Sequence, residues 1–143
     1  MLRLSRLALV LLLSATTAAC GGGGEDTPTS PSVNVPFETV DITLGSGAEA
    51  TVGRQATVAY AGWLYSSTAS QNKGRQFAQP DLFTFTVGTG AIVGFSRGVT
   101  GMRVGGQRRV VIPPDLGYGS AGAPPDIPGN ATLVFDIELR AIQ

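Results

Sequence analysis

The 143-residue chain contains no histidine and only one cysteine, Cys20. Without histidine it cannot build a Ser-His-Asp triad or a Cys-His pair, which excludes the common forms of nucleophilic hydrolysis. Without histidine or a second cysteine it has no zinc site of the ordinary type, and no disulfide can form within it. We therefore expect a protein that works without a metal and without a cofactor.

Charge is also scarce, since charged residues make up 14% of the chain and the formal net charge is +0. Such a balance offers no basic surface, so nucleic acid is not expected as a partner. Arg108 and Arg109 are adjacent, but neighbours on a strand project to opposite faces, and we interpret them as solvated or paired charges. The glycines of 88–94 miss the spacing of a dinucleotide fingerprint by one residue, and no βαβ unit surrounds them.

The first 19 residues have the layout of a secretory signal peptide. Arg3 and Arg6 precede an apolar run from Leu7 to Leu13, which is too short to cross a bilayer, and small residues follow up to Ala19. We therefore expect residues 1–19 to be absent from the mature protein, which would then lie outside the cytoplasm.

The end of this segment, Thr17-Ala18-Ala19-Cys20, resembles the lipobox of bacterial lipoproteins, in which the cysteine becomes the lipid-bearing N-terminus. Thr17 stands where that motif usually has leucine, and cleavage that leaves a free thiol on Cys20 is the alternative. Residues 20–36 are rich in glycine, proline and short polar residues, which predicts a flexible tether. A lipid on Cys20 would hold the domain at a membrane, and Gly21 favours the outer membrane of a two-membrane bacterium.

Residues 37–143 carry the pattern of one α+β domain on an antiparallel sheet. Phe95, Val99 and Met102 predict a helix of about three turns, which Gly105-Gly106 would end. Gly98 and Gly101 are expected to let that helix lie close to the sheet. Alternating apolar residues predict strands at 37–44, 56–65, 83–87, 107–112 and 132–139.

The ten aromatic residues all lie between Phe37 and Phe135. Five of them fall on the inward side of their expected elements: Tyr60, Phe83, Phe85, Phe95 and Phe135. A concave aromatic pocket for a small apolar ligand is one interpretation. A well-filled core is the other, and periodicity alone leaves both open.

Five motifs occur in a fixed order over about residues 37–142: Ala59–Leu64, Gly98–Arg109, Ile112–Pro114, Tyr118-Gly119 and Ile127–Phe135. Together they closely resemble the FK506-binding-protein (FKBP) family of peptidyl-prolyl cis-trans isomerases. The resemblance implies a curved antiparallel sheet of five to six strands wrapped around one short helix, with the active pocket between them. It also implies isomerisation of X-Pro bonds in folding polypeptides and binding of macrolides of the FK506 and rapamycin type. Together with the signal peptide, it leads us to expect a monomer that acts outside the cytoplasm.

Carried over by position, the resemblance also assigns roles to individual residues. Tyr60, Phe77, Phe83 and Phe135 would form the pocket wall, with Phe95 as its floor; Ile92 would offer its N–H and Tyr118 its hydroxyl to a substrate carbonyl; Ala91 and Ile127 would line the rim. The family's pocket aspartate is replaced by Ala78, and Asp81 is the nearest carboxylate along the chain. This departure leaves an alternative, a proline-peptide or macrolide-binding module or chaperone with weak or no turnover.

Overall fold

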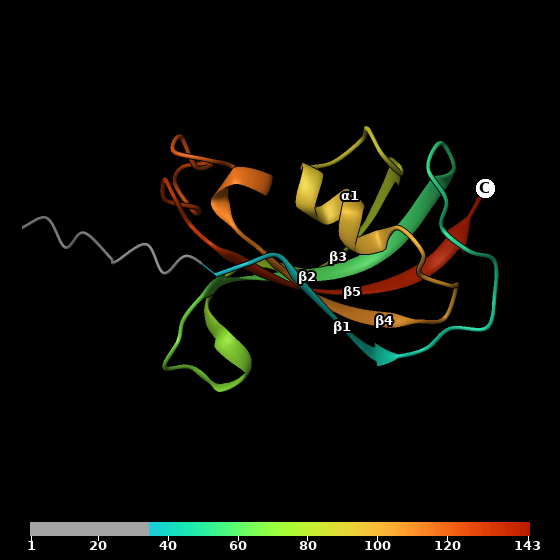
Figure 1. The fold of residues 1–143 in the computed structure, drawn as a ribbon, viewed down its shortest axis with the longest axis horizontal. Helices are drawn as coiled ribbons and strands as arrows, with labels where there is room; N and C mark the ends of the chain where they lie inside the picture. The colour runs from blue at the N-terminus through green and yellow to red at the C-terminus, as the bar shows by residue number, and fades with distance from the viewer. Residues whose placement is uncertain (1–34) are drawn as a thin grey trace, which may run out of the picture.

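The structure is a computed structural model that describes residues 35–143, so the expected signal peptide, Cys20 and most of the 20–36 tether lie outside the described residues. Five strands form one antiparallel sheet in the order β1-β4-β5-β2-β3, and the helix α1 lies across one face of it (Figure 1). The elements are β1 (Glu38–Thr43), β2 (Gln55–Tyr65), η1 (Ser70–Asn72), β3 (Lys73–Thr86), α1 (Val93–Val99), β4 (Gln107–Ile112), η2 (Pro114–Leu116) and β5 (Leu133–Ile142). The predicted α+β fold, a curved sheet around one short helix, is confirmed.

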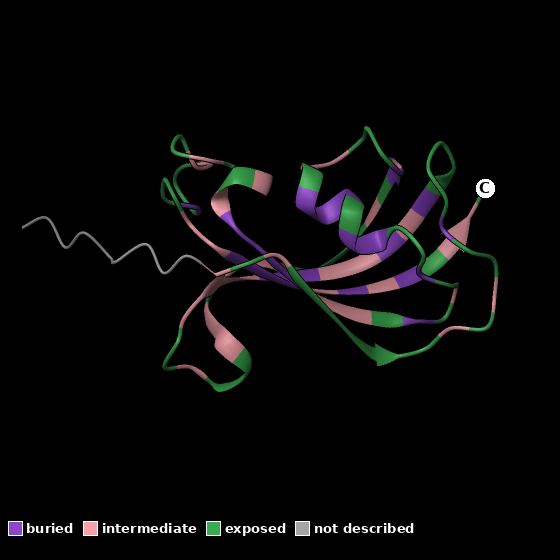
Figure 2. Ribbon diagram, in the orientation of Figure 1, coloured by how far each residue is buried: buried purple, intermediate pink, exposed green. Residues whose placement is uncertain are grey.

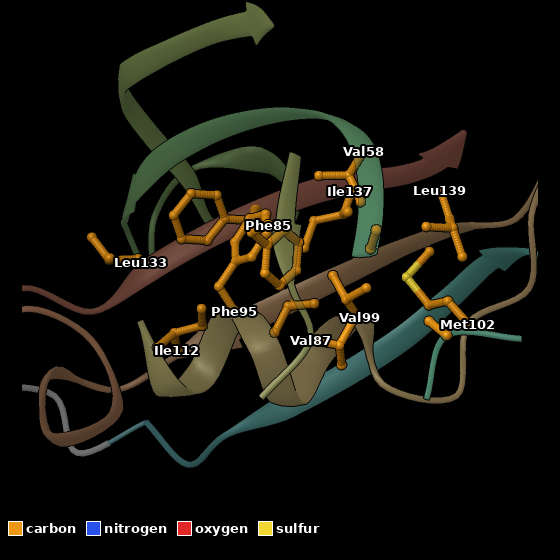
Figure 3. Close-up of a cluster of buried hydrophobic side chains, with 14 of the residues drawn as sticks. Val58, Phe85, Val87, Phe95, Val99, Met102, Ile112, Leu133, Ile137 and Leu139 are labelled. Carbon is orange, nitrogen blue, oxygen red and sulfur yellow. The ribbon is translucent and has the colours of Figure 1, made fainter. Parts of the chain in front are cut away.

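The alternation of β5 decides which face of the sheet is covered. Its apolar residues on one parity are buried: Leu133, Phe135, Ile137 and Leu139. Because alternate side chains of a strand project to opposite faces, these four all point toward α1. Figure 2 shows buried segments on the central strands and on the helix, and Figure 3 shows Phe85, Phe95 and Val99 packed between them. The core is therefore one layer between the helix and the concave face of the sheet.

The helix is shorter than its apolar spacing predicted. It ends at Val99, because Thr100 has a ψ of 130° and Gly101 has a φ of +80°, a left-handed conformation that favours glycine. Met102 is nonetheless only 3% exposed, and its carbonyl accepts a hydrogen bond from the Ala50 N–H at 2.8 Å. Met102 thus lies at the position that helical spacing predicts for a buried residue, although it belongs to the turn after the helix. The predicted end of the helix at Gly105-Gly106 was wrong.

Gly98 has the role predicted for it, whereas Gly101 does not. A Cβ at Gly98 would lie 2.6 Å from Val110 Cγ2, which real contacts do not allow. The missing side chain therefore lets α1 rest directly on β4. A Cβ at Gly101 would meet nothing within 4 Å, so that glycine serves backbone conformation and not close packing.

The first strand, β1, pairs with β4 and so forms one edge of the sheet. All six of its residues are exposed. Arg108 of β4 holds it in place by donating to the Asp41 carboxylate at 2.6 Å and to the helix carbonyl of Gly98 at 3.0 Å. The interpretation of Arg108 as paired charge is confirmed. Within residues 35–143 no helix is both long and apolar enough to span a membrane.

The opposite face of the sheet carries a partly buried group of charges around Asp136. Arg109 donates to one carboxylate oxygen at 2.7 Å and Lys73 to the other at 2.5 Å, while the Lys73 ammonium lies 4.1 Å from the centre of a Trp63 ring. Burial by itself raises the pKa of Asp136. The hydrogen bonds and charges of Arg109 and Lys73 outweigh burial and hold that pKa below its ordinary value of 3.8.

The pKa of Asp136 is lower in the folded chain than in the unfolded one. The carboxylate therefore contributes its full stabilisation at pH values above the ordinary pKa of aspartate. This contribution is lost as the pH falls through the folded-state pKa. We expect Asp136→Asn to lower the free energy of unfolding by about 1–2 kcal/mol at pH 7. Urea unfolding as a function of pH should show the difference from the wild type shrinking below pH ~4.

The matched control is Glu138→Gln, two residues along the same strand and the same face. Glu138 pairs with Arg140 at 2.9 Å, but the Arg140 side chain is 56% exposed. An exposed pair contributes less than about 1 kcal/mol, so this variant should leave the stability nearly unchanged. A pH-independent loss in Asp136→Asn would contradict the assignment.

Candidate functional site

Four aromatic rings from three strands converge on Phe95 of α1. The ring centres of Tyr60, Phe83, Phe85 and Phe135 lie 5.5, 6.1, 5.6 and 5.2 Å from that of Phe95, all near edge-to-face. Phe77 joins the group through Phe135, with the ring centres 5.5 Å apart. Edge-to-face pairs of this kind stabilise a cluster by about 0.5–1.5 kcal/mol each beyond their buried area. The structure thus brings the expected wall residues together around the expected floor.

The exposure of these rings to solvent increases from the floor of the site to its rim. Phe95 and Phe135 are each 4% exposed, whereas Tyr60, Phe77 and Phe83 are half-buried. The floor is therefore closed by packing while the wall reaches solvent. The site is an open aromatic face on the concave side of the sheet.

Gly62 of β2 creates the room for two of the rings. A Cβ at this position would lie 2.6 Å from Phe77 Cζ and 3.0 Å from Phe135 Cε1. Glycine in the middle of a strand often marks such a close approach. The strand thus gives up a side chain so that Phe77 and Phe135 can stand side by side over it.

The loop before α1 presents a free backbone donor at the site. Ser96, which is buried in the helix, accepts a hydrogen bond from the Gly88 N–H at 2.6 Å and so fixes the loop to the helix. Ile92 begins the helix by accepting from the Ser96 N–H at 3.1 Å. Its own N–H has no acceptor among residues 35–143, and Ile92 and Ala91 both pack against the core. An amide proton is therefore available beside the aromatic face.

Two tyrosine hydroxyls mark the polar edge of the site. Burial raises the pKa of Tyr60, and the nearby groups of Tyr118 and Asp81 raise it further. The Tyr60 hydroxyl therefore stays protonated at neutral pH. Tyr118 is 40% exposed, and its chain segment is held by hydrogen bonds from the Gly119 N–H to the Pro114 carbonyl and from the Asn130 N–H to the Gly119 carbonyl, both 2.8 Å.

The last expected rim residue, Ile127, is only 5% exposed and belongs to the core cluster. It is held by a pair of backbone hydrogen bonds with Ala123, at 2.9 and 3.0 Å. Arg75 at the start of β3 donates to the carbonyl of Asp126 and lies 3.8 Å from its carboxylate. This contact joins the Ile127 loop to the strand that carries Phe77.

Ala78 and Asp81 flank an irregular stretch of the β2–β3 pairing. Ala78 lies opposite Gly62 and is half-buried, so no carboxylate enters the site there. Asp81 lies opposite Tyr60. Residues directly opposite each other in an antiparallel pair point to the same face. Asp81 is thus on the same face as the aromatic residues, three residues beyond the position that the resemblance singled out.

Two hollows of the surface lie mainly away from the aromatic face. One of about 390 Å³ is lined by Leu44, Met102 and Arg103 at the far end of α1. The other, of about 250 Å³, lies mainly on the opposite side of the sheet, beside Ala59, Asp136 and Glu138. The arginines and carboxylates lining them already pair with one another or with neighbours. Among residues 35–143 no cluster of three or more potential metal ligands occurs.

Three contributors to the site were not assigned from the sequence. Phe85 was identified only as an inward ring, and in the structure it stacks on Phe83 with ring centres 5.2 Å apart. The mid-strand position of Gly62 was a signal for a close approach that sequence reasoning did not use. Ser96 had no signal, because a serine in a helix is most often solvated and only the fold brings Gly88 to it.

The structure thus combines a curved sheet with one helix across it, a closed aromatic floor and a backbone N–H that has no acceptor among residues 35–143. The chain belongs to the FKBP-type peptidyl-prolyl cis-trans isomerase family, whose model matches residues 47–140.

Relatives of known sequence agree with this family assignment. The FK506-binding protein of Neisseria meningitidis serogroup A is 41% identical over 103 residues, which cover 71% of this chain and 92% of that protein. FK506-binding protein 4 of Dictyostelium discoideum is 42% identical over 115 residues, which cover 78% of this chain but 30% of that protein. The chain thus spans less than a third of the length of some relatives that it matches.

Solved structures agree as well. FkpA from Escherichia coli superposes with a TM-score of 0.63 at 30% identity, covering 75% of this chain and 48% of that one. A peptidyl-prolyl cis-trans isomerase from Pseudomonas syringae pv. tomato superposes with a TM-score of 0.59 at 30% identity, covering 75% of each chain.

Proposed function

We propose that the protein accelerates cis-trans isomerisation of X-Pro bonds in polypeptides and binds macrolides of the FK506 type at the same site. The observation that carries the proposal is the Ile92 N–H, which has no acceptor among residues 35–143, next to a group of aromatic rings that closes on Phe95. Membership of the isomerase family supports it.

The reaction needs no nucleophile. Rotation about an X-Pro amide must break C–N resonance, with a barrier of about 18–20 kcal/mol, and takes tens of seconds unaided. A catalyst has only to bind the twisted amide better than the planar one, and about 8 kcal/mol of such preference gives roughly a million-fold acceleration. Twisting reduces the charge separation between the carbonyl oxygen and the nitrogen. A dry aromatic surface therefore favours the twisted form over the more polar planar form.

The described residues divide this work between them. Tyr60, Phe77 and Phe135 grip the pyrrolidine ring, with Phe95 beneath it and Phe83 beside it. The Ile92 N–H and the Tyr118 hydroxyl hold the carbonyl groups of the neighbouring peptide, while Ala91 and Ile127 bound the site. No acid or base is required, which accords with a site that lacks a carboxylate at Ala78.

We further propose that the mature chain is a lipoprotein that acts on folding polypeptides in the periplasm or at the cell surface. The support is the sequence alone: a signal peptide over 1–19, a lipid on Cys20, and a tether over 20–36 that joins the lipid to the isomerase domain of 37–143. Gly21 favours the outer membrane.

The proposed activity is tested directly with a short X-Pro peptide whose relaxation to equilibrium is followed with and without the purified protein. We expect relaxation that speeds up in proportion to protein concentration and that FK506 blocks. Drug binding without acceleration would contradict the proposal and select a binding module; in that case Ala78→Asp would be expected to restore turnover. Neither binding nor acceleration would remove both functions.

The role of the Ile92 N–H is tested by Ile92→Pro, which deletes that donor. The φ of Ile92 is −56°, within the range that proline adopts, so the substitution is compatible with the backbone. Loss of one hydrogen bond of about 1–1.5 kcal/mol predicts a fall in kcat/KM of about tenfold. Ile92→Val, which keeps the N–H, is the control. Equal activities in two variants of equal melting temperature would show that the donor is not used.

The lipid is tested by growth with a radioactive fatty acid. The wild-type protein should be labelled and fractionate with membranes, whereas Cys20→Ala should be unlabelled and fractionate with soluble proteins. Equal labelling of both would show that Cys20 is not the acceptor.

A further inference from the structure

Asp81 places a carboxylate at the edge of the aromatic face. It lies directly opposite Tyr60 in the β2–β3 ladder, just as Phe83 lies opposite Val58, and both pairs project to the side covered by α1. The Asp81 charge is near enough to the Tyr60 hydroxyl to raise the pKa of that hydroxyl. The preceding Pro80 restricts the backbone on one side. The carboxylate is thus held beside the ring that would contact a proline substrate.

This carboxylate is not neutralised within the described part of the chain. Its only hydrogen bond comes from the Leu82 N–H to Oδ1 at 2.8 Å, and no ion pair involves it among residues 35–143. Two arginines of the same sheet pair with other carboxylates. Arg75 contacts Asp126, and Arg140, on the opposite face, pairs with Glu138 at 2.9 Å. Asp81 therefore projects a net negative charge at the rim of the site.

We infer that Asp81 is a specificity residue and that the preferred substrates are polypeptides with lysine or arginine next to the proline. The inference rests on the proposed isomerase function of the same site. A cation flanking the bound proline would meet the free oxygen of Asp81, while glutamate or aspartate in that position would be repelled. Ala78 leaves the interior of the site uncharged, so this selection is made at the rim without burying a charge beneath the proline ring.

The size of the effect follows from the exposure of Asp81. Opposite charges about 4–8 Å apart in a largely aqueous setting give about a two- to fivefold preference over a neutral residue. Repulsion of an acidic residue gives a similar factor in the other direction. The ratio of kcat/KM for a lysine peptide to that for a glutamate peptide should therefore be about tenfold at low salt.

The experiment uses two sets of tetrapeptides in which lysine, glutamine or glutamate occupies the position before or after the proline. For the wild type, the lysine-to-glutamate ratio of kcat/KM should be about tenfold in at least one set and should fall toward one in 1 M salt, where the Debye length is about 3 Å. Asp81→Asn should bring the ratio close to one at low salt. Asp81→Lys should invert it.

The matched control is Glu38→Gln, which removes one exposed carboxylate from β1, at the opposite edge of the sheet. It should keep the wild-type ratio, because only a charge beside the site acts over so short a range. An unchanged ratio in Asp81→Asn, or equal loss in Glu38→Gln, would overturn the inference while leaving the isomerase function intact. If the wild type accelerates none of the peptides, the proposed function itself fails.

Discussion

The close contact between α1 and β4 sets the geometry of the site. A Cβ at Gly94 would lie 2.3 Å from Ile112 Cγ2, and one at Gly98 would lie 2.6 Å from Val110 Cγ2. Two glycines on one side of a seven-residue helix thus bring its backbone onto the side chains of the strand. Phe95, between them, is thereby lowered into the curve of the sheet, where rings from β2, β3 and β5 reach it. If the helix lay farther from the sheet, Phe95 would lose contact with the rings of the strands.

Most strands could be predicted from the sequence because they follow a local alternation of apolar residues, and β5 is the clearest case. The prediction of a strand at 83–87 was too short, since β3 begins at Lys73 and its first ten residues have no such alternation. The pairing of β1 with β4 could not be predicted, since it joins residues about 70 positions apart and leaves no local pattern. The helix was predicted too long for a related reason. Met102 keeps a helical spacing of buried positions although Gly101 has already turned the backbone. Periodicity reports which residues face the core, and more than one backbone path satisfies it.

The sequence predicted which residues gather at the site, but not how the backbone arranges them. Motif resemblance placed Tyr60, Phe77 and Phe135 in one group, and the structure brings their rings together. Periodicity alone had left a packed core and a ligand pocket equally open, because both bury rings on one face. The structure buries Phe85, Phe95 and Phe135 in the core and leaves Tyr60, Phe77 and Phe83 half-buried, so the same group of rings is core at its base and surface at its rim. Likewise, the unpaired state of the Ile92 N–H is a property of the turn into the helix, which no residue type encodes.

The ion pairs around Asp136 and between Arg108 and Asp41 involve none of the aromatic residues of the site. Asp136 and its two cations lie on the face away from α1, where each charge has a partner. The aromatic face carries no ion pair beneath its rings, and its nearest carboxylate lies at the rim. On the proposed mechanism no charge is needed beneath the rings, because an apolar surface already favours the less polar, twisted amide. A charge at the rim acts on the flanking residue of the substrate instead. Catalysis and selection can then depend on different residues, Phe95 and its neighbours for one and Asp81 for the other.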